Sequence, residues 1–385
     1  MDFKAYSSIP RKQQVALYKS IIKPRMIEEK MLKLLRQGQV SKWFSGIGQE
    51  AIAVGVTQAL RNTDYVFPMH RNLGVFTTRG ITFEKLLNQW QGNFNGFTKG
   101  RDRSFHFGTK EYNIIGMISH LAAMLSVADG VGLASLLEQD DQIAVAFCGE
   151  GATSEGEFHE AINLAAVWNL PVLFVVENNG YGLSTPSSDQ FKCENIADKG
   201  IGYGIDSQIV DGNNVLEVYS EVASIARKIR RKPRPFLLEC KTFRMRGHEE
   251  ASGTKYVPKE LMEFWAEKDP VQNYESYLKS KRFLTDYKIS KHKVAVEEEI
   301  EQGLKVFKSK QKIEVDTNYE LNDVYMNADV PLIKSSDEKE EIRFIDAVSE
   351  GLRGAMREHS NLVLMGQDIA EYGGVFKITE GFIEE

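Results

Sequence analysis

Apolar and polar residues alternate in blocks along the middle of the chain, and these blocks predict strands and helices in turn. Four short apolar runs have the length of buried strands, at 142–148, 171–176, 236–242 and, more weakly, 209–210. Amphipathic stretches over 154–168 and 215–231 are predicted to be helices. This alternation is typical of an α/β fold with a mostly parallel sheet and helices on both faces. Ligands of such sheets bind beyond the carboxyl ends of the strands.

Helical spacing of apolar residues also predicts three helices before this block. They cover residues 11–38 with a break or kink at Pro24, the stretch that follows Gly48, and residues 83–90. Residues 92–117 are rich in glycine, aromatic and charged residues, which predicts a long ordered loop. Long loops of this kind often carry function.

The pattern changes after about residue 283. A charged helix is predicted over 288–311, and residues 312–341 have the composition of a linker. An amphipathic helix is predicted from Phe344 and a strand over 361–365. We therefore predict a domain over 1–311, a linker over 312–341, and the start of a second α/β domain over 342–385.

Composition excludes several classes of protein. With 385 residues, 42 % hydrophobic and 26 % charged, the chain can bury a large core and is neither disordered nor a disulfide scaffold. The net charge of −6 does not favour nucleic-acid or acidic-membrane binding. The three cysteines are too widely spaced for a zinc site, and the first residues lack the apolar core of a secretory signal. We expect a cytoplasmic protein.

Candidate chemistry follows two neighbouring strands of the predicted sheet. Gly149-Glu150-Gly151 comes after the first strand, and Asn178-Asn179-Gly180-Tyr181 comes after the second. If the strands are adjacent, a carboxylate, an amide and a backbone carbonyl meet at one edge, which suits Mg²⁺ shared with a diphosphate. The glycines allow the diphosphate to approach the backbone, and a helix that begins at Ser154 would favour the anion. The alternative is a pair of unrelated turns, but each would then have to follow a buried strand by chance.

These residues carry a resemblance to a known family. The segment GEGATSEGEFHEAINLAAVWNLPVLFVVENNGYGLST resembles the thiamine diphosphate motif of the α subunit of the first, decarboxylating component of 2-oxo acid dehydrogenase complexes. The likeness runs from about residue 10 to about 330 and includes GQEA at 48–51, KGRDRSFHFG at 99–108 and FRMRGH at 243–248. The tail from residue 343 resembles the opening of the β subunit. The chain is therefore similar to an α–β fusion that is cut off early in its β part, and the implied fold is the thiamine diphosphate-binding fold.

The resemblance implies roles for individual residues. Glu150 and Asn179 would ligate Mg²⁺ through their side chains and Tyr181 through its carbonyl. The residues implied to bind thiamine diphosphate are His70, Arg71, Ser119, Leu121, Gly149, Glu150, Gly151, Ala152, Asn179, Tyr181 and His248. Within this set Arg71 would grip the diphosphate, Leu121 would support the bent cofactor, and His70 stands where the family usually has tyrosine. Ala123 and Met124 replace the hydroxyl and amide groups that hold a monovalent cation in some members, so no such cation is predicted.

Two histidines are implied to face the active site. His248 would contact the diphosphate and act in catalysis, whereas the alternative is a solvated histidine in a charged loop. His106 lies between two phenylalanines, and packing within its loop is an equally good explanation.

The implied activity is oxidative decarboxylation of a short 2-oxo acid, with acyl transfer to a lipoyl group of the acyltransferase component. Glu150 favours branched-chain acids of the 3-methyl-2-oxobutanoate type, because branched-chain members share Glu where most members have Asp. The alternatives are a pyruvate or acetoin dehydrogenase, a magnesium-dependent hydrolase of a nucleoside diphosphate, and a non-catalytic cofactor-binding subunit. The implied partners are a β-type domain or subunit and a lipoyl domain. We also expect a homo-oligomer, with neither nucleic acid nor membrane as partner.

Overall fold

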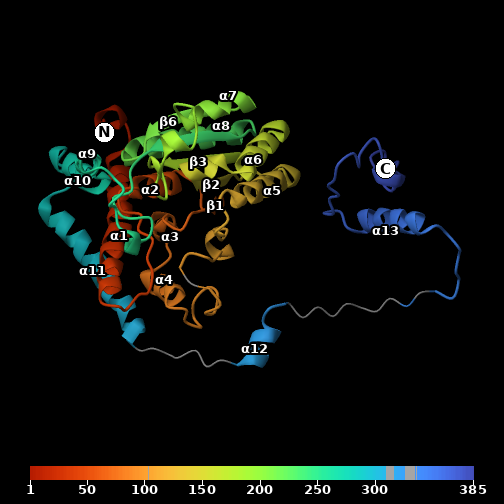
Figure 1. Ribbon diagram of the computed structural model, residues 1–385, viewed down its shortest axis with the longest axis horizontal. Helices are drawn as coiled ribbons and strands as arrows, with labels where there is room; N and C mark the ends of the chain where they lie inside the picture. The colour runs from red at the N-terminus through yellow and green to blue at the C-terminus, as the bar shows by residue number, and fades with distance from the viewer. Residues whose placement is uncertain (103, 309–315, 326–333, 335) are drawn as a thin grey trace. The chain divides into compact units, whose positions relative to one another are not determined.

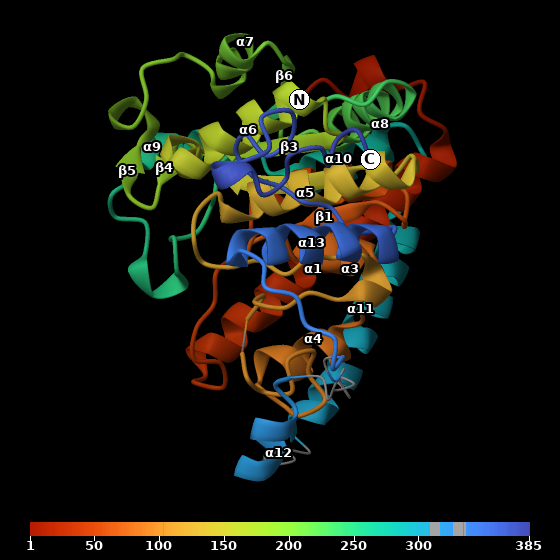
Figure 2. The same ribbon diagram turned by 90° about the vertical axis from the view of Figure 1, so that its right-hand side faces the viewer.

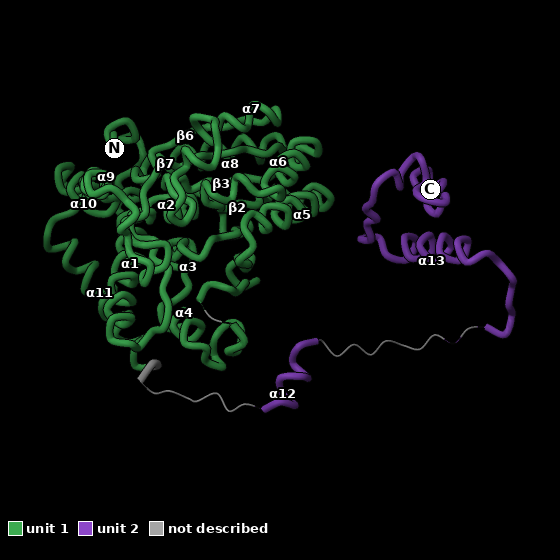
Figure 3. Tube along the Cα trace, in the orientation of Figure 1, with its two compact units in different colours: residues 1–314 green, residues 315–385 purple. Residues whose placement is uncertain are grey.

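The computed structural model describes residues 1–102, 104–308, 316–325, 334 and 336–385. The chain divides into two compact units, residues 1–314 and 315–385, which Figure 3 shows in different colours.

A parallel sheet forms the centre of the first unit. Its five strands lie in the order β1 (Tyr65–Phe67), β2 (Ala144–Gly149), β3 (Val172–Asn178), β7 (Phe236–Lys241) and β6 (Asp206–Asp211). This confirms the predicted mostly parallel sheet. A two-stranded antiparallel pair, β4 (Tyr181–Gly182) with β5 (Thr185–Pro186), follows β3.

Helices surround the sheet. They are α1 (Arg11–Arg36), α2 (Glu50–Ala59), α3 (Leu73–Thr78), α4 (Phe83–Trp90), α5 (Ala123–Glu138), α6 (Gly156–Trp168), α7 (Lys199–Tyr203), α8 (Val215–Arg231), α9 (Lys259–Ala266), α10 (Pro270–Ser280) and α11 (Asp286–Lys308). Within the described ranges, no helix has both the length and the apolar character that crossing a membrane requires.

Side chains of successive strand residues enter two different cores, as the pleat requires. On β2, Val145 and Phe147 join the core formed with α2, α3 and α8, whereas Ala144, Ala146 and Cys148 join the core formed with α5 and α6. The crossover helices α6 and α8 therefore cover opposite faces of the sheet (Figures 1 and 2). The loops that follow the strands, and not the two cores, lie at the carboxyl edge of the sheet.

Several elements differ from the sequence-based expectations. Helix α1 continues through Pro24, because buried residues on both sides, including Ile21 and Ile27, hold the helix although one backbone hydrogen bond is missing. Helix α6 begins at Gly156 rather than at Ser154, and a 3₁₀ turn over Glu150–Ser154 precedes it. Strand β1 and the helices α3, α5, α7, α9 and α10 were not expected. Residues 309–311 of the predicted charged helix lie outside the described residues.

The described part of the 92–117 segment is a loop, as predicted, except for a 3₁₀ turn over Lys110–Tyr112.

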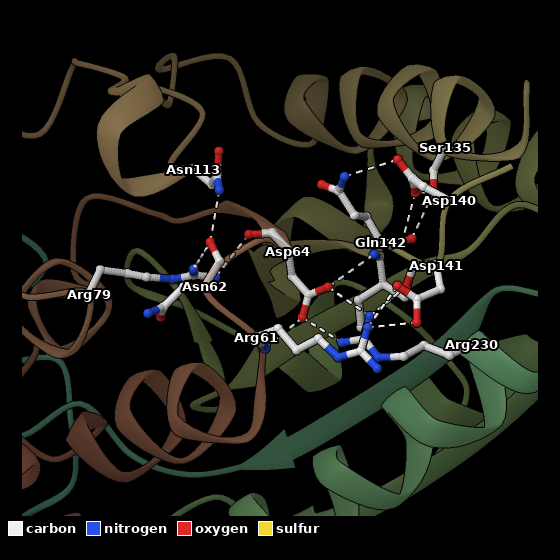
Figure 4. Close-up of polar contacts among 11 residues, drawn as sticks. Arg61, Asn62, Asp64, Arg79, Asn113, Ser135, Asp140, Asp141, Gln142 and Arg230 are labelled. Atoms are coloured by element: carbon white, nitrogen blue, oxygen red, sulfur yellow. Dashed lines mark hydrogen bonds and ion pairs between the residues drawn. The ribbon is translucent and has the colours of Figure 1, made fainter. Parts of the chain in front are cut away.

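A network of ion pairs and hydrogen bonds joins elements at the amino ends of β1 and β2 (Figure 4). Buried Asp64, directly before β1, accepts hydrogen bonds of 2.8 and 2.6 Å from the guanidinium of Arg230 on α8. The same carboxylate accepts from the backbone N–H groups of Arg61 (2.7 Å) and Ile143 (3.2 Å). Asp64 therefore fixes α8 and two strands to one another at the edge opposite the predicted site.

The second unit contains α12 (Thr317–Asn322), α13 (Phe344–Glu358) and a 3₁₀ turn over Val375–Lys377. The helix predicted from Phe344 is confirmed, and α12 lies within the segment predicted as linker. The strand predicted over 361–365 is wrong, because these residues are irregular and the described part of this unit has no strand. A parallel strand needs a neighbour to accept its backbone hydrogen bonds, and a short apolar run alone does not provide one.

Candidate functional site

The predicted metal ligands meet at the carboxyl edge of the sheet. Strands β2 and β3 are adjacent, and Gly149 lies opposite Glu177 in their register. Glu150 and Asn179 therefore leave the sheet side by side, and the Glu150 carboxylate accepts a 3.1 Å hydrogen bond from the Asn179 N–H. The Asn179 side chain accepts from the Tyr181 N–H at 3.2 Å, which closes the turn around Gly180, where φ is +82°.

The surroundings of Glu150 fit a cation. The carboxylate is buried, and burial raises its pKa more than hydrogen bonds and the positive charges of Arg244 and Arg71 lower it. The carboxylate is thus short of positive charge, which a divalent ion would supply. Within the described ranges no group of three His, Cys, Asp or Glu residues could hold a metal. A site here would therefore use the amide and backbone oxygens of the Asn179 turn beside Glu150.

A cavity of about 440 Å³ lies next to Glu150, whose chain neighbour Gly149 is part of its wall. Its wall includes seven of the residues implied by the resemblance, namely His70, His106, Ser119, Leu121, Gly149, Ala152 and His248. A Cβ on Gly149 would meet only open space, so the backbone there is accessible to a ligand. Met117, Ile118, Leu121, Met124 and Phe147 add an apolar wall.

The other implied residues lie outside this wall. Asn179 and Tyr181 line a second hollow of about 400 Å³, together with Phe243 and Trp265. Gly151 instead packs near Gly182 and the side chain of Gln190. The structure thus brings seven of the predicted residues to one cavity, places Asn179 and Tyr181 on a different hollow, and places Arg71, Glu150 and Gly151 on neither wall.

Arg71 and His248 contact each other directly. The buried Arg71 guanidinium donates to the carbonyls of Ser45, at 3.1 Å, and of His248, and it lies 3.1 Å from His248 Nδ1. Burial lowers the pKa of Arg71 to about 9, with Arg244 acting in the same direction. Burial, followed by the charges of Arg71, Arg244 and Lys42, lowers the pKa of His248 to about 4. His248 is therefore neutral near pH 7, and its Nδ1 can accept a hydrogen bond from Arg71.

His70 is also neutral, because burial lowers its pKa well below the usual value. Among the described residues, no group pairs with its buried Nε2 atom. A polar atom that is buried without a partner beside a cavity fits a site that a ligand completes.

His106 faces the cavity as well as its own loop. Its Nε2 lies 3.0 Å from the hydroxyl of Ser119, and its Nδ1 lies 3.4 Å from the carboxylate of Asp102. Its phenylalanine neighbours Phe105 and Phe107 are buried. His106 therefore lines the cavity and also packs within its own loop, and these are the two environments that the sequence left open.

Comparison with known proteins identifies the family. The profile of the dehydrogenase E1 component family matches residues 18–316. The chain belongs to the dehydrogenase E1 component family. It is 37 % identical over 283 residues to a protein of Bacillus subtilis (strain 168) named 2-oxoisovalerate dehydrogenase subunit alpha, and this covers 71 % of the chain and 84 % of that protein.

The chain matches only part of the length of a second relative. The chain is 34 % identical over 320 residues to the Arabidopsis thaliana protein named 2-oxoisovalerate dehydrogenase subunit alpha 2, mitochondrial, which covers 82 % of the chain. The chain spans 66 % of the length of that relative. The family match ends at residue 316, so nearly all of the second unit lies beyond it.

Sequence reasoning did not single out several residues around the site of this family member. Lys42, Phe44 and Asp102 line the cavity, and Glu177 is buried two positions before Asn179. Glu177 carried one usable signal, since it is the only charged residue in the apolar run of β3. The others lie in loops whose course no periodic pattern predicts.

Proposed function

We propose that this chain is the cofactor-binding, α-type part of a thiamine diphosphate-dependent 2-oxo acid dehydrogenase that acts on branched-chain 2-oxo acids. The observation that carries the proposal is the buried Glu150 carboxylate, which meets the Asn179 turn at the carboxyl edge of the sheet beside an open cavity. The name of the relatives, 2-oxoisovalerate dehydrogenase, supports the choice of a branched-chain acid over pyruvate.

The residues present fit the proposed cofactor. Glu150, Asn179 and the Tyr181 carbonyl would hold Mg²⁺, and the backbone at Gly149 and Ala152 together with Arg71 and His248 would hold the diphosphate. When bound, thiamine diphosphate supplies the electron sink that loss of CO₂ from a 2-oxo acid requires. Ser119 and Leu121 lie on the cavity wall, where they would orient the remainder of the cofactor.

The chain's own side chains would also prepare the site for substrate. The neutral imidazole of His248 can accept or donate a proton beside the cavity, and Arg71 fixes its position. The apolar wall formed by Met117, Ile118, Leu121, Met124 and Phe147 would exclude water and accommodate a branched aliphatic side chain.

The proposal includes partners. A β-type domain or subunit would complete the active site, and the acyl group would pass to a lipoyl domain of an acyltransferase. Homo-oligomerisation and a cytoplasmic location stay predictions from the sequence.

Reconstitution with a β-type subunit tests the proposal. We expect the assembled enzyme to oxidise 3-methyl-2-oxobutanoate with an artificial electron acceptor, and to do so with a higher kcat/KM than for pyruvate. Thiamine diphosphate with Mg²⁺ should raise the Tm of the chain, whereas ADP with Mg²⁺ should not. Stabilisation by ADP alone would favour a nucleotide hydrolase, and a preference for pyruvate would overturn the substrate assignment.

A further inference from the structure

Glu177 is a buried carboxylate at the end of β3 that the proposed function leaves without a role. It is fully inaccessible to solvent and lies two positions before Asn179. Its two oxygens accept two hydrogen bonds of 2.5 Å, one from the side-chain amide of Asn72 and one from that of Gln49. The donors come from two turns that are far apart in the sequence.

The bond to Asn72 fixes the turn that carries His70 and Arg71. While its amide nitrogen donates to Glu177, the side-chain oxygen of Asn72 accepts from the Met69 N–H at 2.7 Å. The Asn72 N–H in turn donates to the Met69 carbonyl at 3.1 Å. Both ends of the Met69–Asn72 turn are thus closed through one side chain, and Glu177 ties that side chain to β3.

The bond to Gln49 fixes a second turn, residues 46–49, which supports both Arg71 and the segment before His248. A Cβ on Gly46 would collide with the Arg71 carbonyl, and a Cβ on Gly48, whose φ is +103°, would collide with the Phe243 carbonyl. The Met245 N–H donates to the Ile47 carbonyl at 3.0 Å. This turn therefore packs directly against backbone on both sides.

We propose that Glu177 is a positioning residue that holds the Arg71 turn and the 46–49 turn in register with the Asn179 turn. That register would direct Arg71 and His248 toward the diphosphate of the cofactor whose Mg²⁺ Glu150 and Asn179 would hold. The inference deepens the proposed function and rests on it for the identity of that ligand.

Glu177 supplies two acceptors here, and the surrounding side chains show which substitutions would preserve both hydrogen bonds. A glutamine at 177 keeps one oxygen for Asn72, whose own amide cannot rotate without losing the bond from Met69 N–H. Gln49 can rotate, because its side-chain oxygen is buried with no partner among the described residues. It would then accept from the new amide. Glu177→Gln should therefore preserve both ties, whereas Glu177→Leu leaves two buried donors unpaired.

The test measures binding of thiamine diphosphate with Mg²⁺ to the 385-residue chain by calorimetry. We expect Glu177→Gln to change the Kd by less than about threefold and Glu177→Leu to raise it at least about tenfold. Arg71→Ala should raise the Kd as well. In the Arg71→Ala background Glu177→Leu should raise the Kd by a smaller factor than in the wild type, because part of its effect passes through Arg71. Fully additive effects would indicate general destabilisation and overturn the inference, as would a Glu177→Leu variant that binds like the wild type.

Hydrogen exchange of the cofactor-free chain separates this inference from the proposed function. Asn72→Ala and Gln49→Ala each cut one tie and are milder than Glu177→Leu. We expect faster exchange in 66–74 for Asn72→Ala, in 46–49 and 243–248 for Gln49→Ala, and in all three segments for Glu177→Leu. Unchanged exchange would overturn the positioning role whether or not the cofactor binds. If the variants show the expected exchange but the wild type binds no thiamine diphosphate, only the proposed function is overturned.

Discussion

Glu150 lacks the ion-pair partner that two other buried carboxylates of the chain have. Glu50 is paired with Arg25 at 2.5 Å, and Asp64 is paired with Arg230. The Glu150 side chain accepts from the Asn179 N–H, and Arg244 and Arg71 act on it only through their charges. A buried carboxylate without an ion-pair partner costs stability unless a cation joins it. The residue is thus better suited to binding a cation than to stabilising the fold.

This contrast predicts the effect of removing the Glu150 carboxylate. Glu150→Ala should weaken Mg²⁺-dependent binding of thiamine diphosphate by at least about 100-fold, because the metal loses its anionic protein ligand. The Tm without cofactor should stay equal or rise, since an uncompensated buried charge is removed. Calorimetric titration with and without Mg²⁺ measures the first effect. Glu155→Ala is the matched control, because Glu155 is exposed on the same loop and should bind normally. Binding by Glu150→Ala with wild-type Mg²⁺ dependence would refute the metal assignment.

Glu28 gives the chain a stability that depends on pH. Burial raises its pKa from 4.5 to about 7, although the Trp43 indole N–H and the Gly46 N–H donate to it. The folded state therefore holds this proton more tightly than the unfolded state does. The stability contributed by protonation is fully present below pH 4.5 and is lost as the pH rises to about 7.

Glu28→Gln should remove that dependence. Relative to the variant, the wild type should lose on the order of 3 kcal/mol between these pH values. The midpoint of urea unfolding of both proteins across this range measures the difference. The pKa of Glu177 is also raised, but Glu177 is present in both proteins and cancels. Parallel pH profiles for the two proteins would contradict the prediction.

At the residue scale, the sequence identified the site residues that follow strands but not the residues that position them. Glu150 and Asn179 could be found because each follows a recognisable apolar run. The contact between Asn72 and Glu177 could not be found, because it joins residues 105 positions apart through a turn with no periodic pattern. Positions at strand ends are set by local sequence, whereas contacts between turns depend on the finished packing.

At the scale of elements, the prediction succeeded where apolar residues are periodic or continuous. Helices α4 and α8 begin and end where their patterns predicted. Strand β1 was missed because it has only three residues. Helix α5 was missed because its apolar residues surround the helix and form no single stripe. The strand predicted at 361–365 shows the opposite error, since an apolar run was taken for a strand without a partner.

The ion pair at the amino edge of the sheet should matter for stability and not for binding. Asp64→Ala should lower the free energy of unfolding by about 3–5 kcal/mol, because it leaves the partly buried Arg230 guanidinium without its partner carboxylate and leaves the backbone N–H groups of Arg61 and Ile143 without an acceptor. Binding of thiamine diphosphate should be unchanged, because Asp64 lies at the strand ends opposite to the site. Urea unfolding and calorimetry on the same protein measure the two effects.

Asp141 provides the matched control for Asp64. It also pairs with an arginine, Arg61 at 2.6 Å, but both side chains are exposed. Asp141→Ala should therefore leave the Tm almost unchanged. A loss as large as that of Asp64→Ala would show that burial is not what makes the Asp64 pair important.

At the scale of the whole molecule, the family match and the candidate site both lie in the first unit. The second unit adds α13, whose apolar residues Phe344 and Met356 are exposed within that unit. We predict that the chain by itself shows no turnover of 3-methyl-2-oxobutanoate, because activation of the cofactor requires a carboxylate at its pyrimidine ring. By resemblance to the family, that carboxylate belongs to the β-type part.

A decarboxylation assay with an artificial electron acceptor checks this prediction. The purified 385-residue chain should be inactive, and addition of a β-type subunit should produce turnover. Turnover by the chain alone would show that the activating carboxylate lies within these residues and that the active site is divided differently.

The order of strands in the sheet also determines when each strand can pair with its neighbours during synthesis on the ribosome. Strand β3 ends at Asn178, but its second neighbour, β7, begins only at Phe236. At a translation rate of about 5–20 residues per second, one edge of the apolar strand β3 therefore waits roughly 3–12 s for its partner. A nascent chain that stalls in this interval exposes unpaired backbone beside Leu173 and Val175, which is the kind of edge that recruits chaperones or aggregates. Rare codons between β3 and β7 should therefore lower the yield of folded protein more than rare codons placed after Lys241.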